Sequence, residues 1–204
     1  MAKGLDVAED STDHIECLTN RGFEFIGRYY NTNTPSKNLT VAEAQALSAA
    51  SLTIVAIWEN GFPTTAGYFS KAKGVSDARA AFKMASQVIG QPEGSAIYFA
   101  VDYDATAKDV SGPITQYFQG VASVLDAAEQ RYEIGVYGSG ATCQSLLDVG
   151  LVRFTWLSQS TSFRGTKTFK AFNIKQGPEN KHLCGMDADK DEAPDVVSCG
   201  GFTV

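Results

Sequence analysis

The sequence predicts a single (β/α) barrel of the TIM type in which the last helices are shortened or missing. Two observations predict this fold class. Segments with the composition of strands alternate with helical segments over most of the chain, and the connections between them are short. Eight strands are expected but only five well-marked helices, all of them before the sixth strand. Because no linker, repeat or low-complexity tract divides the 204 residues, we expect one domain over residues 1–204.

The eight predicted strands are short runs rich in branched and aromatic residues. The third, TIVAIWE, is apolar on both faces, which is typical of a sheet flanked by helices. In chain order the predicted strands cover residues 4–8, 23–30, 53–59, 96–102, 132–138, 154–159, 169–176 and about 185–189.

Capping residues mark the ends of the predicted helices. The first helix stops at Gly22, and Thr40 with Glu43 forms a capping box at the start of the second. The five helices cover residues 11–21, 40–51, 76–89, about 110–130 and 141–149. A doubly wound open sheet is the alternative fold, but its Gly-rich phosphate loop would follow the first strand, where this chain reads DVAED.

Composition excludes several classes of partner and cofactor. With 44% hydrophobic and 20% charged residues the chain is an ordinary globular protein, and no apolar run approaches the roughly 18 residues of a membrane span. The net charge is −6 and the lysines are scattered, so we expect neither nucleic acid nor an anionic membrane as partner. We also expect no cofactor, no metal and a monomeric protein.

The four cysteines have no metal-binding spacing. Cys17 and Cys143 fall in predicted helices, where a buried free thiol is the commoner state. Cys184 and Cys199 fall in a terminal segment with several glycines and are the better candidates for a disulfide.

Acidic residues recur where the predicted strands end, which is where barrel enzymes place their chemistry. They are Asp6, Glu59, Asp102, Asp104 and, near the eighth strand, Asp187 and Asp189. In AIYFAVD the large residues alternate onto one face, so Asp102 and Asp104 should face the lumen, as should Asp6 in the first strand. Because the eighth strand closes against the first, the late acids should lie beside Asp6.

Clustered carboxylates raise at least one pKa, and a protonated acid beside an ionised one can cleave a glycosidic bond. Binding of a divalent cation is the competing explanation. Aromatic and amide side chains at the same rim suit a polysaccharide, and Arg28 could instead neutralise the acids. The residues we expect to bind substrate are Arg28, Tyr30, Tyr103, Tyr137, Trp156, Gln159, Gln176, Asp187 and Asp189.

The order of motifs resembles a known family. GLDVA, FIGRYY, IVAIWENG, IYFAVDYD, GVYGSG, WLSQS and IKQG follow one another as in the glycoside-hydrolase-like family of unknown function that is related to glycoside hydrolase family 25, the barrel-fold lysozymes. The resemblance runs from about residue 3 to residue 191. In the family 25 muramidases the fourth strand ends in Asp-x-Glu, whose Glu is the proposed proton donor.

By that resemblance Asp6 and Asp102 match two of the acids, and Asp104 stands where the catalytic Glu would be. Because Asp is one methylene shorter, Glu59 on the neighbouring strand is the other candidate for the general acid. The sequence thus predicts an enzyme, a lysozyme-like glycoside hydrolase that acts on peptidoglycan or a related wall polysaccharide, with Asp102 ionised and Asp6 and a late Asp positioning sugar or water.

A protein that cleaves wall polymer must reach it, so we expect secretion or action at the cell envelope, although no signal segment is visible. Two alternatives belong to other classes. One is a wall-glycan-binding barrel without turnover, and the other is a phosphoesterase dependent on a divalent metal.

Overall fold

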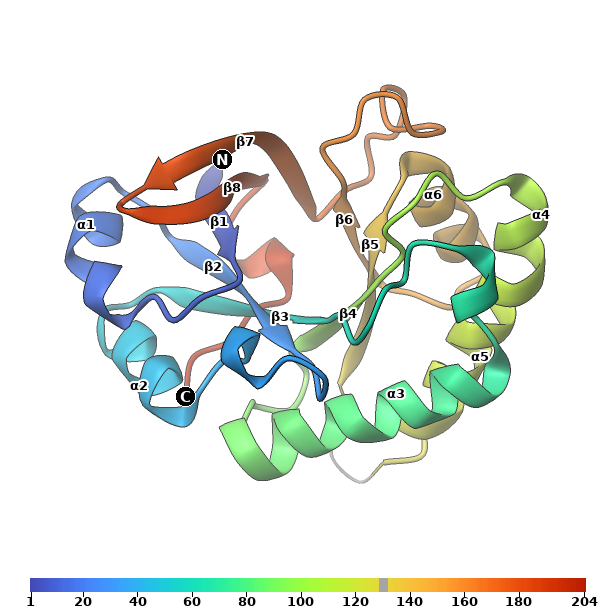
Figure 1. Cartoon of the computed structure of the whole chain (residues 1–204), viewed down its shortest axis with the longest axis horizontal. Coiled ribbons are helices and arrows are strands. Elements are labelled where there is room, and N and C mark those ends of the chain that lie inside the picture. Colours follow the sequence, from blue (N-terminus) through green and yellow to red (C-terminus); the bar gives the residue numbers. More distant parts are fainter. Residues whose placement is uncertain (129–131) are drawn as a thin grey trace.

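The computed structural model describes residues 1–128 and 132–204, with the side chains of 178–181 omitted. Its strands close into a barrel in chain order, which confirms the predicted fold class (Figure 1). The strands are β1 Ala2–Val7, β2 Phe25–Tyr30, β3 Thr53–Trp58, β4 Ala96–Ala100, β5 Glu133–Gly138, β6 Phe154–Leu157, β7 Ile174–Leu183 and β8 Met186–Ala193.

Strand β8 departs from the parallel ring that the sequence suggested. It pairs antiparallel with both β7 and β1, whereas the other neighbouring strands pair in parallel. The chain passes from β7 to β8 through Cys184 and Gly185 alone, and a connection this short cannot make the crossover that a parallel pair needs. The last two strands therefore form a hairpin that fills the gap between β6 and β1 (Figure 1).

Helices cover the outside of the early strands, and α3 and α5 pack along each other (Figure 1). The predicted helix over 110–130 consists of a π-helical segment, Val110–Ile114, and α5, and it is preceded by the short helix α4. Its predicted end over 129–130 lies outside the described residues. The α-helices are α1 Ile15–Asn20, α2 Val41–Ala49, α3 Lys71–Lys83, α4 Ala107–Asp109, α5 Thr115–Leu125 and α6 Gly140–Asp148.

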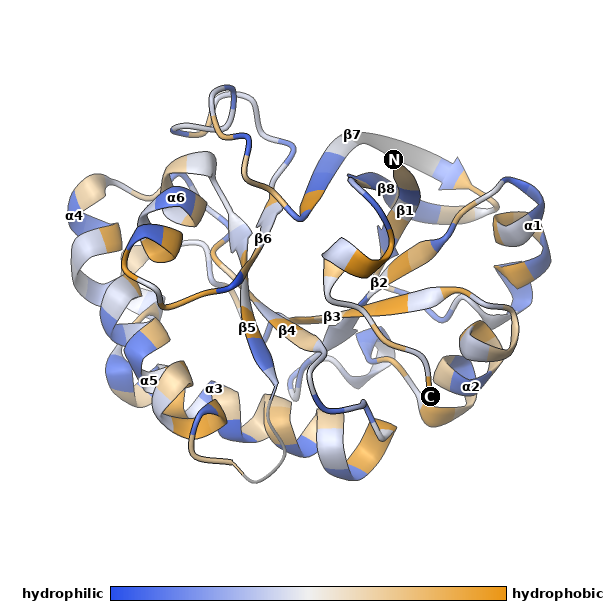
Figure 2. Ribbon diagram, turned by 180° about the vertical axis from the view of Figure 1, so that it is seen from behind, coloured by the Kyte–Doolittle hydropathy of each residue, from blue (hydrophilic) through white to orange (hydrophobic). Residues whose placement is uncertain are grey.

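The apolar residues form two layers, one on each face of the strands. On β4, Ile97 and Phe99 pack outward under the helices, and Tyr98 and Ala100 pack into the lumen with Trp156, as the alternation predicted. Figure 2 shows hydrophobic colouring along β3 and β4 and mixed colouring on the helices. No helix within the two described ranges is long and apolar enough to cross a membrane.

A fully buried ion pair fixes the layer outside β2. The guanidinium of Arg28 donates to both carboxylate oxygens of Glu43, at 2.7 and 2.9 Å, and to the carbonyl of Val7 at 2.6 Å. Glu43 also accepts from the amide and hydroxyl of Ser11 at 2.9 and 2.8 Å. Thr40 caps α2 as predicted, but the carboxylate of Glu43 turns to Arg28 instead of completing a capping box. Charge neutralisation and a full set of donors offset the desolvation of this pair.

The predicted disulfide is wrong. Cys17 of α1 is bonded to Cys184 in the β7–β8 turn, while Cys143 and Cys199 are buried free thiols. The reversal of the chain at β8 brings Cys184 over α1, whereas Cys199 lies at the base of the lumen, where its carbonyl accepts from Tyr98. The bond thus ties the hairpin to the body of the barrel.

Candidate active site

A cavity of about 290 Å³ opens at the carboxyl ends of the parallel strands. It brings together eight of the residues that the sequence singled out and two that it did not, Tyr29 and Ile57. Its lining is Asp6, Tyr29, Ile57, Glu59, Asp102, Tyr137, Trp156, Gln159, Gln176 and Asp189.

Asp6 lies at the base of this cavity, on the lumen face of β1. Its carboxylate accepts from the amide of Gln176 at 2.8 Å and from the hydroxyl of Tyr29 at 3.2 Å. Asp189 is its register partner on β8. Burial, followed by the negative charge of Asp189, raises the pKa of Asp6 to about 7, although the two hydrogen bonds oppose the shift.

Asp191 is a buried acid next to Asp6 that the sequence analysis did not include. It is 4% exposed, and one oxygen accepts from the indole N–H of Trp156 at 2.9 Å. Burial and the charge of Asp6 raise the pKa of Asp191 well above its usual range. The second carboxyl oxygen of Asp191 is buried without a hydrogen-bond partner among the described residues. The available signal was its position two residues after Asp189 and four after Asp187, because even spacings put all three on one strand face.

Glu59 and Asp102 lie nearer the mouth. Glu59 follows β3 directly, and burial, together with the charge of Asp102, raises its pKa against the opposing charge of Lys37. Partial burial also raises the pKa of Asp102, which follows β4 and reaches solvent. The charge of Asp102 thus favours the protonated form of Glu59, an arrangement in which one carboxyl group can carry a proton while the other is ionised.

Asp104 and Tyr103 follow the same strand but do not line the cavity. Asp104 accepts from the side chain and the backbone amide of Arg164, both at 2.7 Å, and its carbonyl accepts from the same guanidinium at 2.8 Å. These bonds tie the loop after β4 to the loop after β6. Tyr103 stacks on Phe69 with ring centroids 6.1 Å apart.

Arg28 and Tyr30 lie on the outer face of β2, which corrects their expected place in the site. Both are fully buried; Arg28 pairs with Glu43, and the hydroxyl of Tyr30 donates to Gln91 at 2.9 Å. Because side chains alternate along the strand, Tyr29 faces the lumen in their place.

The amide and aromatic residues form a network that holds the acids in position. Gln176 donates to Asp6 and, at 3.0 Å, to Asp189, and it accepts from the hydroxyl of Tyr137 at 2.9 Å. Gln159 also donates to Asp189, at 3.3 Å. The ring of Trp156 meets that of Tyr137 edge to face. Amides that bridge acids in this way fix their positions without neutralising them.

Asp187 does not line the 290 Å³ cavity. It is exposed, approaches the imidazole of His182 at 3.7 Å, and lines a smaller cavity of about 160 Å³ on the β1–β8 side of Asp6. Among the described residues, no three His, Cys, Asp or Glu side chains are placed together to hold a metal ion.

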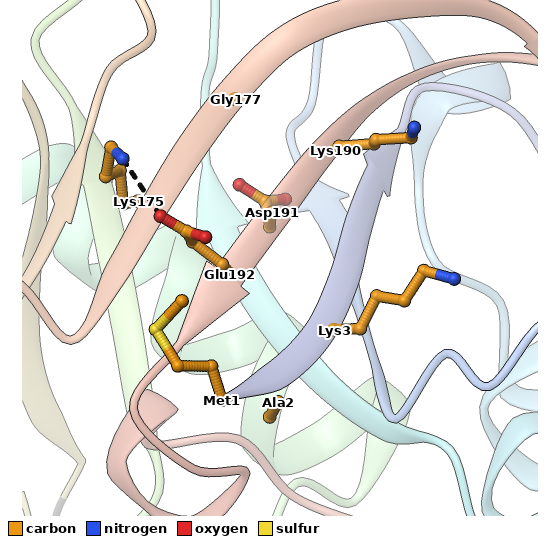
Figure 3. A pocket seen from close by; sticks show the side chains of 8 residues that line it. All are labelled: Met1, Ala2, Lys3, Lys175, Gly177, Lys190, Asp191 and Glu192. Carbon is orange, nitrogen blue, oxygen red and sulfur yellow. Dashed lines mark hydrogen bonds and ion pairs between the residues drawn. The ribbon is translucent and has the colours of Figure 1, made fainter.

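A larger cavity, of about 390 Å³, lies at the opposite end of the β1–β8 seam. Figure 3 shows the ion pair of Lys175 and Glu192 on one side of it and the extended side chains of Lys3 and Lys190 on the other. Asp191 is the one carboxyl group of the acid cluster that borders it. The other acids and the amides converge in the cavity of about 290 Å³, and we therefore take that cavity as the candidate active site.

Residues 16–191 match the family model described as Rv2525c-like, glycoside hydrolase-like domain. The chain belongs to this family. Among its relatives is the uncharacterized protein FadG of Bacillus subtilis, 30% identical over 165 residues, which are 78% of this chain and 28% of FadG. The chain thus corresponds to less than a third of that relative. The resemblance noted in the sequence is confirmed by this match.

Solved structures share the fold of this family member. The Tat-secreted protein Rv2525c of Mycobacterium tuberculosis, in complex with L-tartrate, superposes with a TM-score of 0.82 at 22% identity, covering 98% of both chains. A muramidase from Acremonium alcalophilum superposes with a TM-score of 0.61 at 13% identity, covering 98% of this chain and 97% of its own. At these identities the similarity is one of fold.

Proposed function

We propose that this protein is a glycoside hydrolase that cleaves a cell-wall glycan of the peptidoglycan type, with Glu59 as general acid. The observation that carries the proposal is the open cavity at the carboxyl ends of the strands, which Glu59 and Asp102 both line and in which burial and the charge of Asp102 raise the pKa of Glu59. The fold shared with a muramidase supports the same class of substrate.

In the proposed reaction Glu59 donates a proton to the glycosidic oxygen, so that the leaving sugar departs as an alcohol. Asp102, ionised, stabilises the positive charge that develops on the sugar ring or directs water to it. Glu59 is favoured over Asp104 because it lines the cavity, whereas the carboxylate of Asp104 is engaged by Arg164. The raised pKa keeps Glu59 protonated above the range of an ordinary carboxylic acid.

Asp6, Asp189 and Gln176 are positioning residues in this proposal. Their network presents carboxylate and amide oxygens at the base of the cavity, where hydroxyl or acetamido groups of a sugar ring can donate to them. Tyr137 and Trp156 add apolar ring surface beside these oxygens.

We further propose that the protein acts outside the cytoplasm. The Cys17–Cys184 disulfide supports this, because structural disulfides persist in oxidising compartments. Rv2525c, which shares the fold, is a Tat-secreted protein.

The test is release of reducing ends from purified peptidoglycan. Glu59→Gln should lower the rate by about 10²–10⁴-fold, the usual contribution of a general acid. The matched control is Glu16→Gln, which makes the same chemical change on the exposed side of α1 and should leave the rate unchanged. Wild-type rates should fall as pH rises through the raised pKa of Glu59, and this decline should be absent from the residual activity of Glu59→Gln.

A glycan-binding barrel without turnover is the second candidate. The departure of Asp104 from the family 25 pattern, with its carboxylate paired to Arg164, is the observation in its favour. Saturable binding of soluble wall glycan by wild type, with no reducing ends released in a long incubation, would establish binding and overturn the hydrolase. Absence of both binding and release would overturn both functions.

A further inference from the structure

Phe62 is an exposed aromatic residue on the loop that follows Glu59. It is 84% exposed, and it is the aromatic member of the exposed large apolar side chains in residues 1–128 and 132–204. The others are aliphatic: Met1, Val41, Val88, Val149, Val197 and Val204. An isolated apolar side chain on a surface needs no explanation by itself. The position of Phe62 and the rigidity of its loop are what set it apart.

The first half of the loop is fixed by Asn60. Its side-chain oxygen accepts from the amides of Thr32 and Asn33, at 3.0 and 3.1 Å, which joins the loop after β3 to the loop after β2. Its carbonyl oxygen and the buried carboxylate of Asp77 both lie 2.9 Å from the hydroxyl of Tyr68, whose single proton is shared between these two acceptors. The backbone that leads to Phe62 is therefore held from two sides.

The second half of the loop is fixed against the mouth of the cavity. Pro63 is buried, and its carbonyl accepts from the backbone amide of Asp102 at 2.9 Å. Phe62 thus stands between Glu59, three residues earlier in the chain, and the residue that carries the second acid of the mouth. Gly61, with φ of +87°, makes the turn that a residue with a side chain would adopt only under strain.

The cavity itself is small for a polymer. Its volume of about 290 Å³ is near the lower end of the range for ligand pockets, so it encloses only a short part of a glycan chain. The remainder of the glycan must leave across the rim, and the loop that carries Phe62 runs from Glu59 to Pro63, whose carbonyl binds the backbone amide of Asp102.

We propose that Phe62 is a stacking subsite for a sugar ring of the glycan, adjacent to the ring held in the cavity; this inference rests on the proposed function. The C–H groups on one face of a pyranose ring carry partial positive charge and pack on the negative face of a phenyl ring. Because the loop is already fixed by hydrogen bonds, ordering it on binding costs little entropy. Phe62 touches substrate away from the bond that breaks, so it sets affinity for longer chains and leaves the chemical step unchanged.

The test compares wild type, Phe62→Ala and Phe62→Tyr on soluble oligomers of alternating N-acetylglucosamine and N-acetylmuramic acid of increasing length. Phe62→Ala should raise KM for long oligomers about tenfold, with kcat unchanged and no effect on the shortest oligomer that is cleaved. Phe62→Tyr keeps the ring and should restore the wild-type KM. Val197→Ala, equally exposed but in a turn after β8, should match wild type.

Two failures are distinguishable. If wild type cleaves the oligomers and Phe62→Ala has an unchanged KM at every length, or a lowered kcat at every length, the subsite is overturned while the hydrolase stands. If wild type neither binds nor cleaves any oligomer, the proposed function is overturned and the subsite with it. Unchanged melting temperatures of the variants establish that each is folded.

Discussion

The molecule buries carboxylates on both faces of the barrel wall, but it satisfies them in different ways. Outside β2, Glu43 receives two hydrogen bonds from the guanidinium of Arg28 and two from Ser11. In the lumen, Asp6 and Asp191 receive hydrogen bonds only from neutral groups of the described residues, and the charge of Asp6 raises the pKa of Asp191.

Whether a counter-ion is present decides whether a buried carboxyl group stabilises the fold or can take part in proton transfer. A carboxylate with a full set of donors and a counter-ion stays ionised and holds elements together. Carboxyl groups that lack a counter-ion share protons and titrate near neutral pH. A buried carboxyl group therefore holds the structure together at Glu43, where a guanidinium faces it, and has a raised pKa at Asp6, where none does.

The largest effect should come from breaking the outer pair. Glu43→Gln leaves Arg28 buried without a counter-ion and should lower the free energy of unfolding by about 3–5 kcal/mol at any pH between 5 and 8. Denaturant unfolding measures this loss. The double variant Arg28→Met/Glu43→Leu, which removes both charges, should recover most of it. A loss below 1 kcal/mol in Glu43→Gln would mean that the ion pair does not stabilise the fold.

Removing a buried carboxylate from the lumen, by Asp6→Asn, should raise the free energy of unfolding above neutral pH, whereas Glu43→Gln lowers it. Between the usual value of 3.8 and about 7 the native state binds more protons at Asp6 than the unfolded state does, so wild-type stability falls as pH rises through that window. Asp6→Asn removes this dependence and should be the more stable protein at pH 8, by an amount on the order of a few kcal/mol. Unfolding free energies at pH 4, 6 and 8 measure the two slopes. If the free energy of unfolding changed with pH equally in the variant and in wild type, Asp6 would not bind more protons in the native state than in the unfolded state.

The fold class followed from local pattern. The alternation in β4 predicted Tyr98 and Ala100 in the lumen and Ile97 and Phe99 outside, and closure of the last strand against the first predicted a late acid beside Asp6, where Asp189 lies. These inferences agree with the structure because they depended only on the two-residue period of a strand and on the closure of a barrel.

The errors came from contacts that no local pattern encodes. Arg28 resembles a ligand residue in the sequence because its partner Glu43 lies on another element and was assigned to a cap. The disulfide joins residues 167 positions apart, across a turn whose reversal the sequence analysis did not foresee. Asp191 was left out because the predicted eighth strand ended at 189, two residues before Asp191 and four before the observed end of β8 at Ala193.

The central claim is that the lumen acids hold a proton near neutral pH, and a carbon-13 NMR titration of the Asp6 carboxyl group tests it most directly. The expected result is a midpoint near 7 in wild type. Asp189→Asn should move the midpoint to lower pH, because it removes a negative charge beside Asp6, and the control Tyr137→Phe should move it much less. A midpoint near 3.8 in wild type would contradict the claim and would leave the lumen acids as ordinary ionised side chains.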